Sequence, residues 1–209
     1  MLYTSLKDYY SANQLIIKIC RGNMLLPWIT SQFNFTYAPI YLVRHPFAVV
    51  LSQIKQGGWN NPYKKFEIPS TPYNEIYWNH STFLGKLTTR EEILTFIWCL
   101  TNQVPLNHQQ NNQDWITVYY ENLLLNPTIE INRIFDRWNL SIPVRIQEKY
   151  RKKSPTAINP KDIKEPHDQL SSWQHELNPD QISRMIQVLK YFDIQHYSAE
   201  DVMPKVIMK

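Results

Sequence analysis

The spacing of apolar residues changes sharply around residue 45. Residues 39–43 form a continuous apolar run rich in residues that favour β-structure, which is typical of a buried parallel strand. Pro46 follows, and proline suits the first turn of a helix because its missing N–H is not needed there. Apolar residues then recur at helical spacing, at Phe47, Val50, Leu51 and Ile54. The pattern therefore predicts a strand over 39–43, a turn, and a helix over 46–56.

Similar patterns predict further elements along the chain. Strand candidates cover residues 15–20 and 115–120, and residues 193–209 look like a loose tail. Helices are expected within 24–35, over 74–84, and from a capping box at Thr89 to a break at Pro105. Two more are expected, from Pro127 to Trp138 with Asn126 as the N-cap, and over 180–192 after a second N-cap at Asn178. Strands that alternate with helices predict an α/β domain with a mainly parallel sheet.

Length, charge and cysteine content limit the classes of protein to which this chain can belong. The 209 residues suit a single domain, and the net charge of +4 fits an anionic cofactor or substrate but not a dedicated nucleic-acid binder. Cys20 and Cys99 are too few for a disulfide framework, so we expect a reducing, cytoplasmic location. No apolar run approaches the ~18 residues of a membrane span. The histidines lack the paired spacings of zinc sites, so no metal is expected.

Arg44 and Ser52 are the candidates for ligand binding. Arg44 ends the predicted strand, and open α/β sheets bind ligands at the carboxyl ends of their strands. A guanidinium matches phosphate oxygens, and Ser52, about two helical turns on, adds a hydroxyl. Taken alone, the pair also fits an arginine at a sheet edge and a serine on a solvated helix face. With Pro46, however, it resembles the 3′-phosphate-binding motif of sulfotransferases that use 3′-phosphoadenosine 5′-phosphosulfate (PAPS).

A second block, residues 119–127, is similar to that family's strand ending in Tyr-Glu-Asp-Leu before a proline-started helix. The resemblance implies that Tyr120 contacts the adenine, although a core-facing tyrosine is an equal alternative. Glu121 is expected to anchor the loop by hydrogen bonds. The basic residues ending in Lys153 resemble the segment that closes over the 3′-phosphate, although charge runs are usually solvated faces.

The resemblance does not supply a general base for the transfer. Lys18 matches the family lysine near the transferring sulfonate, but Cys20 stands where cytosolic members have a catalytic histidine. Either another residue is the base, or the chain is inactive, or the register differs. We expect Cys20 to be a buried structural thiol rather than a catalytic residue. The substrate side is expected over 57–90, where aromatic residues and two base candidates lie: Trp59, Tyr63, Phe66, Tyr73, Glu67 and His80. The aromatic residues either line a substrate pocket or cover nearby core.

The family's glycine-bearing phosphosulfate loop has no counterpart in this sequence. The four glycines, at 22, 57, 58 and 85, form no Gly-x-x-Gly-x-Lys arrangement. In the family the strand before that loop lies between the strands matching 39–43 and 115–119. Those two strands must therefore pair directly, or a partner must supply the strand, or the domain is N-terminally truncated. We favour truncation.

The resemblance implies a P-loop nucleoside-triphosphate-hydrolase-like fold of three layers, with the core over about 15–192. The function implied is sulfonate transfer from PAPS to a hydroxyl or amine of a small-molecule or glycan acceptor. The alternative is a defective relative that binds only the nucleotide or a partner protein, and a homo-oligomer is compatible with either. A nucleoside-triphosphate kinase would need a phosphate loop and a magnesium-binding carboxylate, and the sequence indicates neither.

Overall fold

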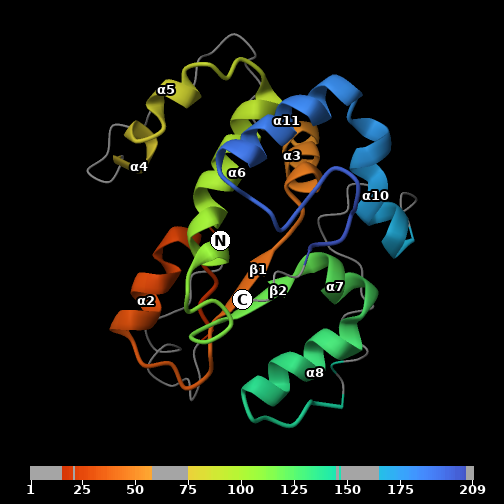
Figure 1. Ribbon diagram of the computed structural model, residues 1–209. Helices are drawn as coiled ribbons and strands as arrows, with labels where there is room; N and C mark the ends of the chain where they lie inside the picture. The colour runs from red at the N-terminus through yellow and green to blue at the C-terminus, as the bar shows by residue number, and fades with distance from the viewer. Residues whose placement is uncertain (1–15, 21, 58–74, 145, 147–164, 206–209) are drawn as a thin grey trace.

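The fold is built around two parallel strands that pair directly. The computed structural model describes residues 16–20, 22–57, 75–144, 146 and 165–205. Within these ranges β1 (Ile40–Val43) lies beside β2 (Ile116–Tyr119), with Ile40 paired to Ile116 and Val43 to Tyr119 (Figure 1). Direct pairing, one of the outcomes expected for the missing strand, is therefore observed in this chain, and N-terminal truncation stays a prediction. The chain is therefore α/β with a small parallel sheet.

The predicted strand–turn–helix unit is confirmed. Helix α3 (Pro46–Lys55) follows β1 after a turn of two residues, Arg44 and His45, and has Pro46 in its first turn. The His45 side chain caps this helix, because its Nδ1 atom accepts a hydrogen bond from the backbone N–H of Phe47. A rigid first turn therefore sets the direction in which the chain leaves the sheet.

Helix α6 (Arg90–Asn107) starts at the predicted capping box. Thr89 accepts a bond from the Glu92 N–H, and the Glu92 carboxylate accepts one from the Thr89 N–H. The predicted break at Pro105 is wrong, because the helix continues to Asn107. Pro105 lies in the last turn, where its missing N–H removes a single helical bond while the continuation buries Leu106 completely.

The remaining helices include one that the sequence did not predict, α7, which starts at Tyr120 directly after β2. The expected helix over 74–84 is divided into two short ones. The predicted caps differ in outcome: Asn178 forms a capping box with Gln181, whereas the Asn126 side chain makes no cap bond. The bounds are η1 (Asn23–Leu25), α2 (Leu26–Gln32), α4 (Glu75–Trp78), α5 (Ser81–Leu84), α7 (Tyr120–Leu125), α8 (Pro127–Arg137), α10 (Pro166–Glu176) and α11 (Pro179–Tyr191).

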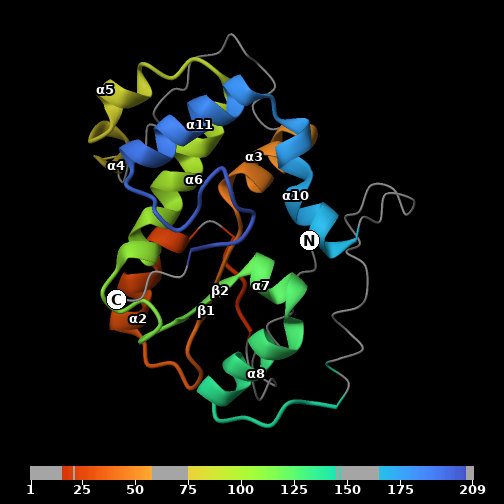
Figure 2. The ribbon, with the colours of Figure 1, turned by 45° about the vertical axis from the view of Figure 1, so that its right-hand side comes forward.

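Helices pack on both faces of the strand pair. On one face, the hydroxyl of Tyr41 donates a hydrogen bond to Asn102 of α6. Helix α6 itself packs against α3 and α11. On the other, Ile116 and Val118 contact Ile134 of α8. Figure 2 shows α8 on the side of the strands away from α11, with α10 beside α3 and α7. No helix in the described part of the chain is both long and apolar enough to cross a membrane.

Two expectations about residues 16–20 are wrong. Residues 16–20 form no strand: Ile16 is 95% exposed, and these residues pair with neither β1 nor β2. An apolar run becomes a strand only when a neighbour accepts its backbone hydrogen bonds. Cys20 in this segment is exposed, so it is not a buried structural thiol.

The segment expected to be a loose tail is packed within residues 193–205. Ile194, His196, Tyr197 and Val202 are buried, and the Lys205 N–H donates to the His196 carbonyl. Both ribbon views show this segment lying between α11 and the strands (Figures 1 and 2). It therefore belongs to the core, next to the carboxyl ends of β1 and β2.

Candidate functional site

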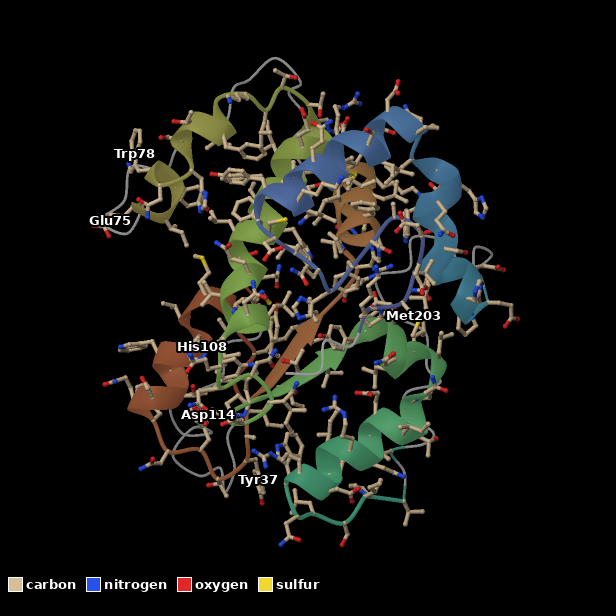
Figure 3. The ribbon with its side chains drawn as sticks, viewed as in Figure 1. Tyr37, Glu75, Trp78, His108, Asp114 and Met203 are labelled. Atoms are coloured by element: carbon tan, nitrogen blue, oxygen red, sulfur yellow. The ribbon has the colours of Figure 1, made fainter. Side chains whose placement is uncertain are left out.

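Arg44 and Tyr120 meet where the two parallel strands end. Because Val43 pairs with Tyr119, the residues that follow them emerge side by side at one edge of the sheet. The Arg44 Cζ atom lies 4.8 Å from the centroid of the Tyr120 ring. A guanidinium at this distance over an aromatic ring is attracted by the negative face of the ring. Tyr37 and Asp114, which precede the two strands, lie at the opposite edge (Figure 3).

The Arg44 guanidinium has unused hydrogen-bonding capacity. Its Nε atom is buried and has no hydrogen-bond partner among the described residues. An arginine stays charged at every accessible pH, and a buried donor without an acceptor costs free energy. An anionic oxygen at this position would supply the missing acceptor and balance the charge. A guanidinium with a free donor is a group that a phosphate could use.

Glu121 ties the two strand ends together. Its Oε1 atom accepts from the His45 backbone N–H at 2.8 Å, and its Oε2 atom accepts from the Tyr197 hydroxyl at 3.2 Å. The carboxylate is completely buried, and burial raises its pKa, while its hydrogen bonds and the nearby Arg44 charge act in the opposite direction. The expectation that Glu121 anchors the loop is confirmed.

His45 faces the core rather than the Arg44 side of the turn. Its ring stacks on Trp173 with centroids 4.7 Å apart, and only 1% of the residue is exposed. Because Nδ1 accepts from Phe47, the ring proton is on Nε2, which donates to the Ser198 carbonyl at 3.1 Å. Burial lowers the pKa of His45 to about 4. The ring is therefore neutral and fully engaged, which does not suit a general base.

Helix α10 reaches the site through Gln169, a residue that the sequence reasoning missed. The Gln169 Nε2 atom donates to the Tyr120 hydroxyl at 2.9 Å. Gln169 lies one helical turn before Trp173, which is completely buried against His45 and Phe47. The apolar spacing of Leu170, Trp173 and Leu177 would have predicted which face of this helix is buried. It would not have predicted the bond to Tyr120, which depends on tertiary contact.

Of the other predicted site residues, Ser52 and Lys18 are described, and neither contacts the Arg44–Tyr120 pair directly. Ser52 lies on α3 as expected and is half-buried, and its hydroxyl accepts from Gln56 Nε2 at 3.4 Å. Lys18 is exposed, in the segment that forms no strand, and makes no ion pair with a described residue. Lys153, Glu67 and the aromatic residues of the 58–74 loop lie outside the described residues.

His80, the other base candidate, is held in an aromatic cluster. Its Nδ1 atom lies 2.9 Å from the Tyr191 hydroxyl, and its ring packs 4.8 Å from the Phe192 ring. Burial lowers its pKa. These contacts join α5 to the end of α11, so the observed role of His80 is structural.

No family model matches the chain, and neither a curated protein nor a solved structure is significantly similar to it. In the described ranges, no three histidine, cysteine or acidic residues are grouped so that they could hold a metal ion. Function must therefore be argued from the Arg44 site itself.

Proposed function

We propose that this chain is a sulfotransferase that binds PAPS through Arg44 and transfers its sulfonate to a hydroxyl or amine of a small-molecule or glycan acceptor. The observation that carries the proposal is the buried, unpaired Nε atom of Arg44, held over Tyr120 where the parallel strands end. The proposal includes the finer fold, a three-layer domain of the P-loop nucleoside-triphosphate-hydrolase type with a mainly parallel sheet.

Arg44 would bind the 3′-phosphate. Its fork of donors matches two phosphate oxygens, and the guanidinium lies over the Tyr120 ring, with Cζ 4.8 Å from the ring centroid. The Ser52 hydroxyl, half-buried on α3, is the second proposed donor. Tyr120 has its hydroxyl bound to Gln169 and its ring next to Arg44, so any contact with the adenine would use the remaining ring surface.

Residues for the transfer step are less well supported. PAPS supplies an activated sulfonate whose oxygens carry negative charge, and Lys18 is the proposed cation beside them. Its assignment rests on the sequence resemblance, because Lys18 is exposed and does not contact the Arg44 site. Lys153 is proposed as a further cation at the 3′-phosphate on the same ground. No described residue has the position of a general base.

The direct pairing of β1 with β2 favours a second candidate function, nucleotide binding without transfer. The two strands occupy the neighbouring positions between which the family's phosphosulfate-loop strand would lie. A chain built in this way keeps the Arg44 site for the 3′-phosphate. Between these two strands, in the described part of the chain, there is no loop whose backbone donors could cradle the phosphosulfate.

Calorimetric titration with adenosine 3′,5′-bisphosphate and with adenosine 5′-monophosphate tests the binding site. The bisphosphate should bind more tightly, and Arg44→Ala should weaken it by roughly 1.5–3 kcal/mol, the range for a charged hydrogen bond. That loss corresponds to about 10- to 150-fold in affinity. The monophosphate, which lacks the 3′-phosphate, should be unaffected.

Arg137→Ala is the matched control, because Arg137 donates to the Gln113 carbonyl before β2, at the other end of the sheet. It should bind both nucleotides like the unchanged protein. A folded Arg44→Ala variant with full bisphosphate affinity would overturn the assignment. Incubation with PAPS and phenol, amine or glycan acceptors then separates the candidates: acceptor-dependent release of the bisphosphate supports transfer, and binding without release supports the second function.

A further inference from the structure

Arg44 depends on a neighbour for its orientation. Its guanidinium makes no hydrogen bond to a described residue, and its contact with the Tyr120 ring, 4.8 Å from Cζ to the ring centroid, is the interaction that restrains the group. A bidentate bond to phosphate requires the guanidinium plane to be held at a defined angle. Whatever fixes the Tyr120 ring therefore also fixes the direction of the Arg44 donors.

The Tyr120 ring is held at its far end by Gln169. The side chain of Tyr120 is half-buried, and the bond from Gln169 Nε2 to its hydroxyl, 2.9 Å long, joins the first residue of α7 to α10. Helix α10 is itself fixed, because it packs against both α3 and α7 and buries Trp173 completely. The bond thus connects a rigid helix to the aromatic surface under the guanidinium.

We infer that Gln169 is a positioning residue for the 3′-phosphate site, acting on Arg44 through the Tyr120 hydroxyl. The inference rests on the proposed function and adds a residue that the sequence motifs did not include. It also gives Tyr120 a role on Arg44, where the family resemblance implied one on the adenine. The bond should increase the affinity for a nucleotide that carries a 3′-phosphate and leave the affinity for one that lacks it unchanged.

Gln169→Leu removes the amide donor while keeping a side chain of similar length. We expect this variant to bind adenosine 3′,5′-bisphosphate about 3- to 10-fold more weakly, the range for one neutral hydrogen bond. Its affinity for adenosine 5′-monophosphate should not change. Gln174→Leu is the matched control: it makes the same substitution on the same helix, at a side chain without a hydrogen bond to a described residue.

A double-mutant cycle distinguishes positioning from general stability. Tyr120→Phe keeps the ring but removes the hydroxyl, so it should weaken bisphosphate binding as much as Gln169→Leu does. The double variant should then be no weaker than either single variant, because both remove the same bond. Tyr120→Phe also tests the inference alone if Gln169→Leu does not fold.

The outcomes separate the inference from the proposed function. Equal affinity of the unchanged protein for the two nucleotides would overturn the proposed function. A preference for the bisphosphate that survives undiminished in Gln169→Leu would overturn the inference and leave that function intact. Equal losses for both nucleotides, or additive losses in the double variant, would show that Gln169 acts on the fold in general and would also overturn the inference.

Discussion

Acid should destabilise this protein through His45. The ring is 1% exposed and uses both nitrogens: Nδ1 accepts from the Phe47 N–H, and Nε2 donates to the Ser198 carbonyl. Protonation would add a proton at Nδ1, which would end the cap on α3 and place a charge in a buried site. The carbonyls of Ser198 and Asp201 favour the charged form but do not offset burial, and the neighbouring Arg44 charge adds to its effect.

The size of the effect follows from the pKa. Burial lowers the pKa of His45 from 6.5 to about 4, so the unfolded chain binds this proton more readily than the fold does. Stability is therefore complete above the unfolded pKa and falls as the pH drops toward the folded value. Between about pH 7 and pH 5 the expected loss is about 2 kcal/mol, out of about 3 kcal/mol for the full shift.

His45→Asn isolates this contribution. The asparagine oxygen can still cap α3, but the side chain does not titrate. The free energy of unfolding in urea should be measured for both proteins at several values of pH. The variant loses the stacking on Trp173 and is expected to be less stable throughout, but the stability difference between the two proteins should shrink by about 2 kcal/mol on acidification to about pH 5.

Parallel pH curves for the two proteins would refute the reasoning. Glu121 does not produce this difference in stability. Burial raises its pKa, so its contribution to stability is lost as the pH rises. That contribution is also present in both proteins and cancels from the comparison. Imidazole NMR of the unchanged protein is an independent check, since a His45 ring that titrates near its ordinary pKa would contradict the structure even if the variant did not fold.

Three further predictions concern the packing around the site. Trp173→Ala should lower the free energy of unfolding by about 3–5 kcal/mol, because it empties a completely buried position against His45; a loss below about 1 kcal/mol in denaturant would contradict this packing. Thr89→Ala should cost about 1 kcal/mol by removing the cap of α6, as measured by thermal unfolding, and Thr89→Ser should restore most of it. Arg184→Leu should cost about 1–3 kcal/mol, because it leaves the buried Glu91 carboxylate without the guanidinium that joins α11 to α6; equal stability of Arg184→Leu and Arg184→Lys would argue against a role for that pair.

Local signals predicted the elements that depend on neighbouring residues. Pro46 after an apolar run predicted where α3 begins, and the capping residues Thr89 and Asn178 predicted the starts of α6 and α11. These signals work because a cap or a proline acts within one turn of the backbone. Arg44 was found for the same reason, as the polar residue that ends a strand.

Signals of this kind failed where the outcome depended on a distant partner. Residues 16–20 have the composition of a strand, but no neighbouring strand pairs with them, and the segment after α11 looks polar although Tyr197 is buried against Glu121 and His45. Pro105 was predicted to end a helix, yet the burial of Leu106 outweighs one missing hydrogen bond.

The amino-acid sequence by itself determined the strand–turn–helix unit and the cation at its turn, because both depend on residues only a few positions apart. Only the tertiary structure decided that β1 and β2 pair directly, that Tyr120 lies under Arg44, and that Gln169 holds the Tyr120 ring. Those contacts join segments far apart in the chain. They form only when helix packing brings the strand ends and α10 to one place, and local spacing does not encode that arrangement.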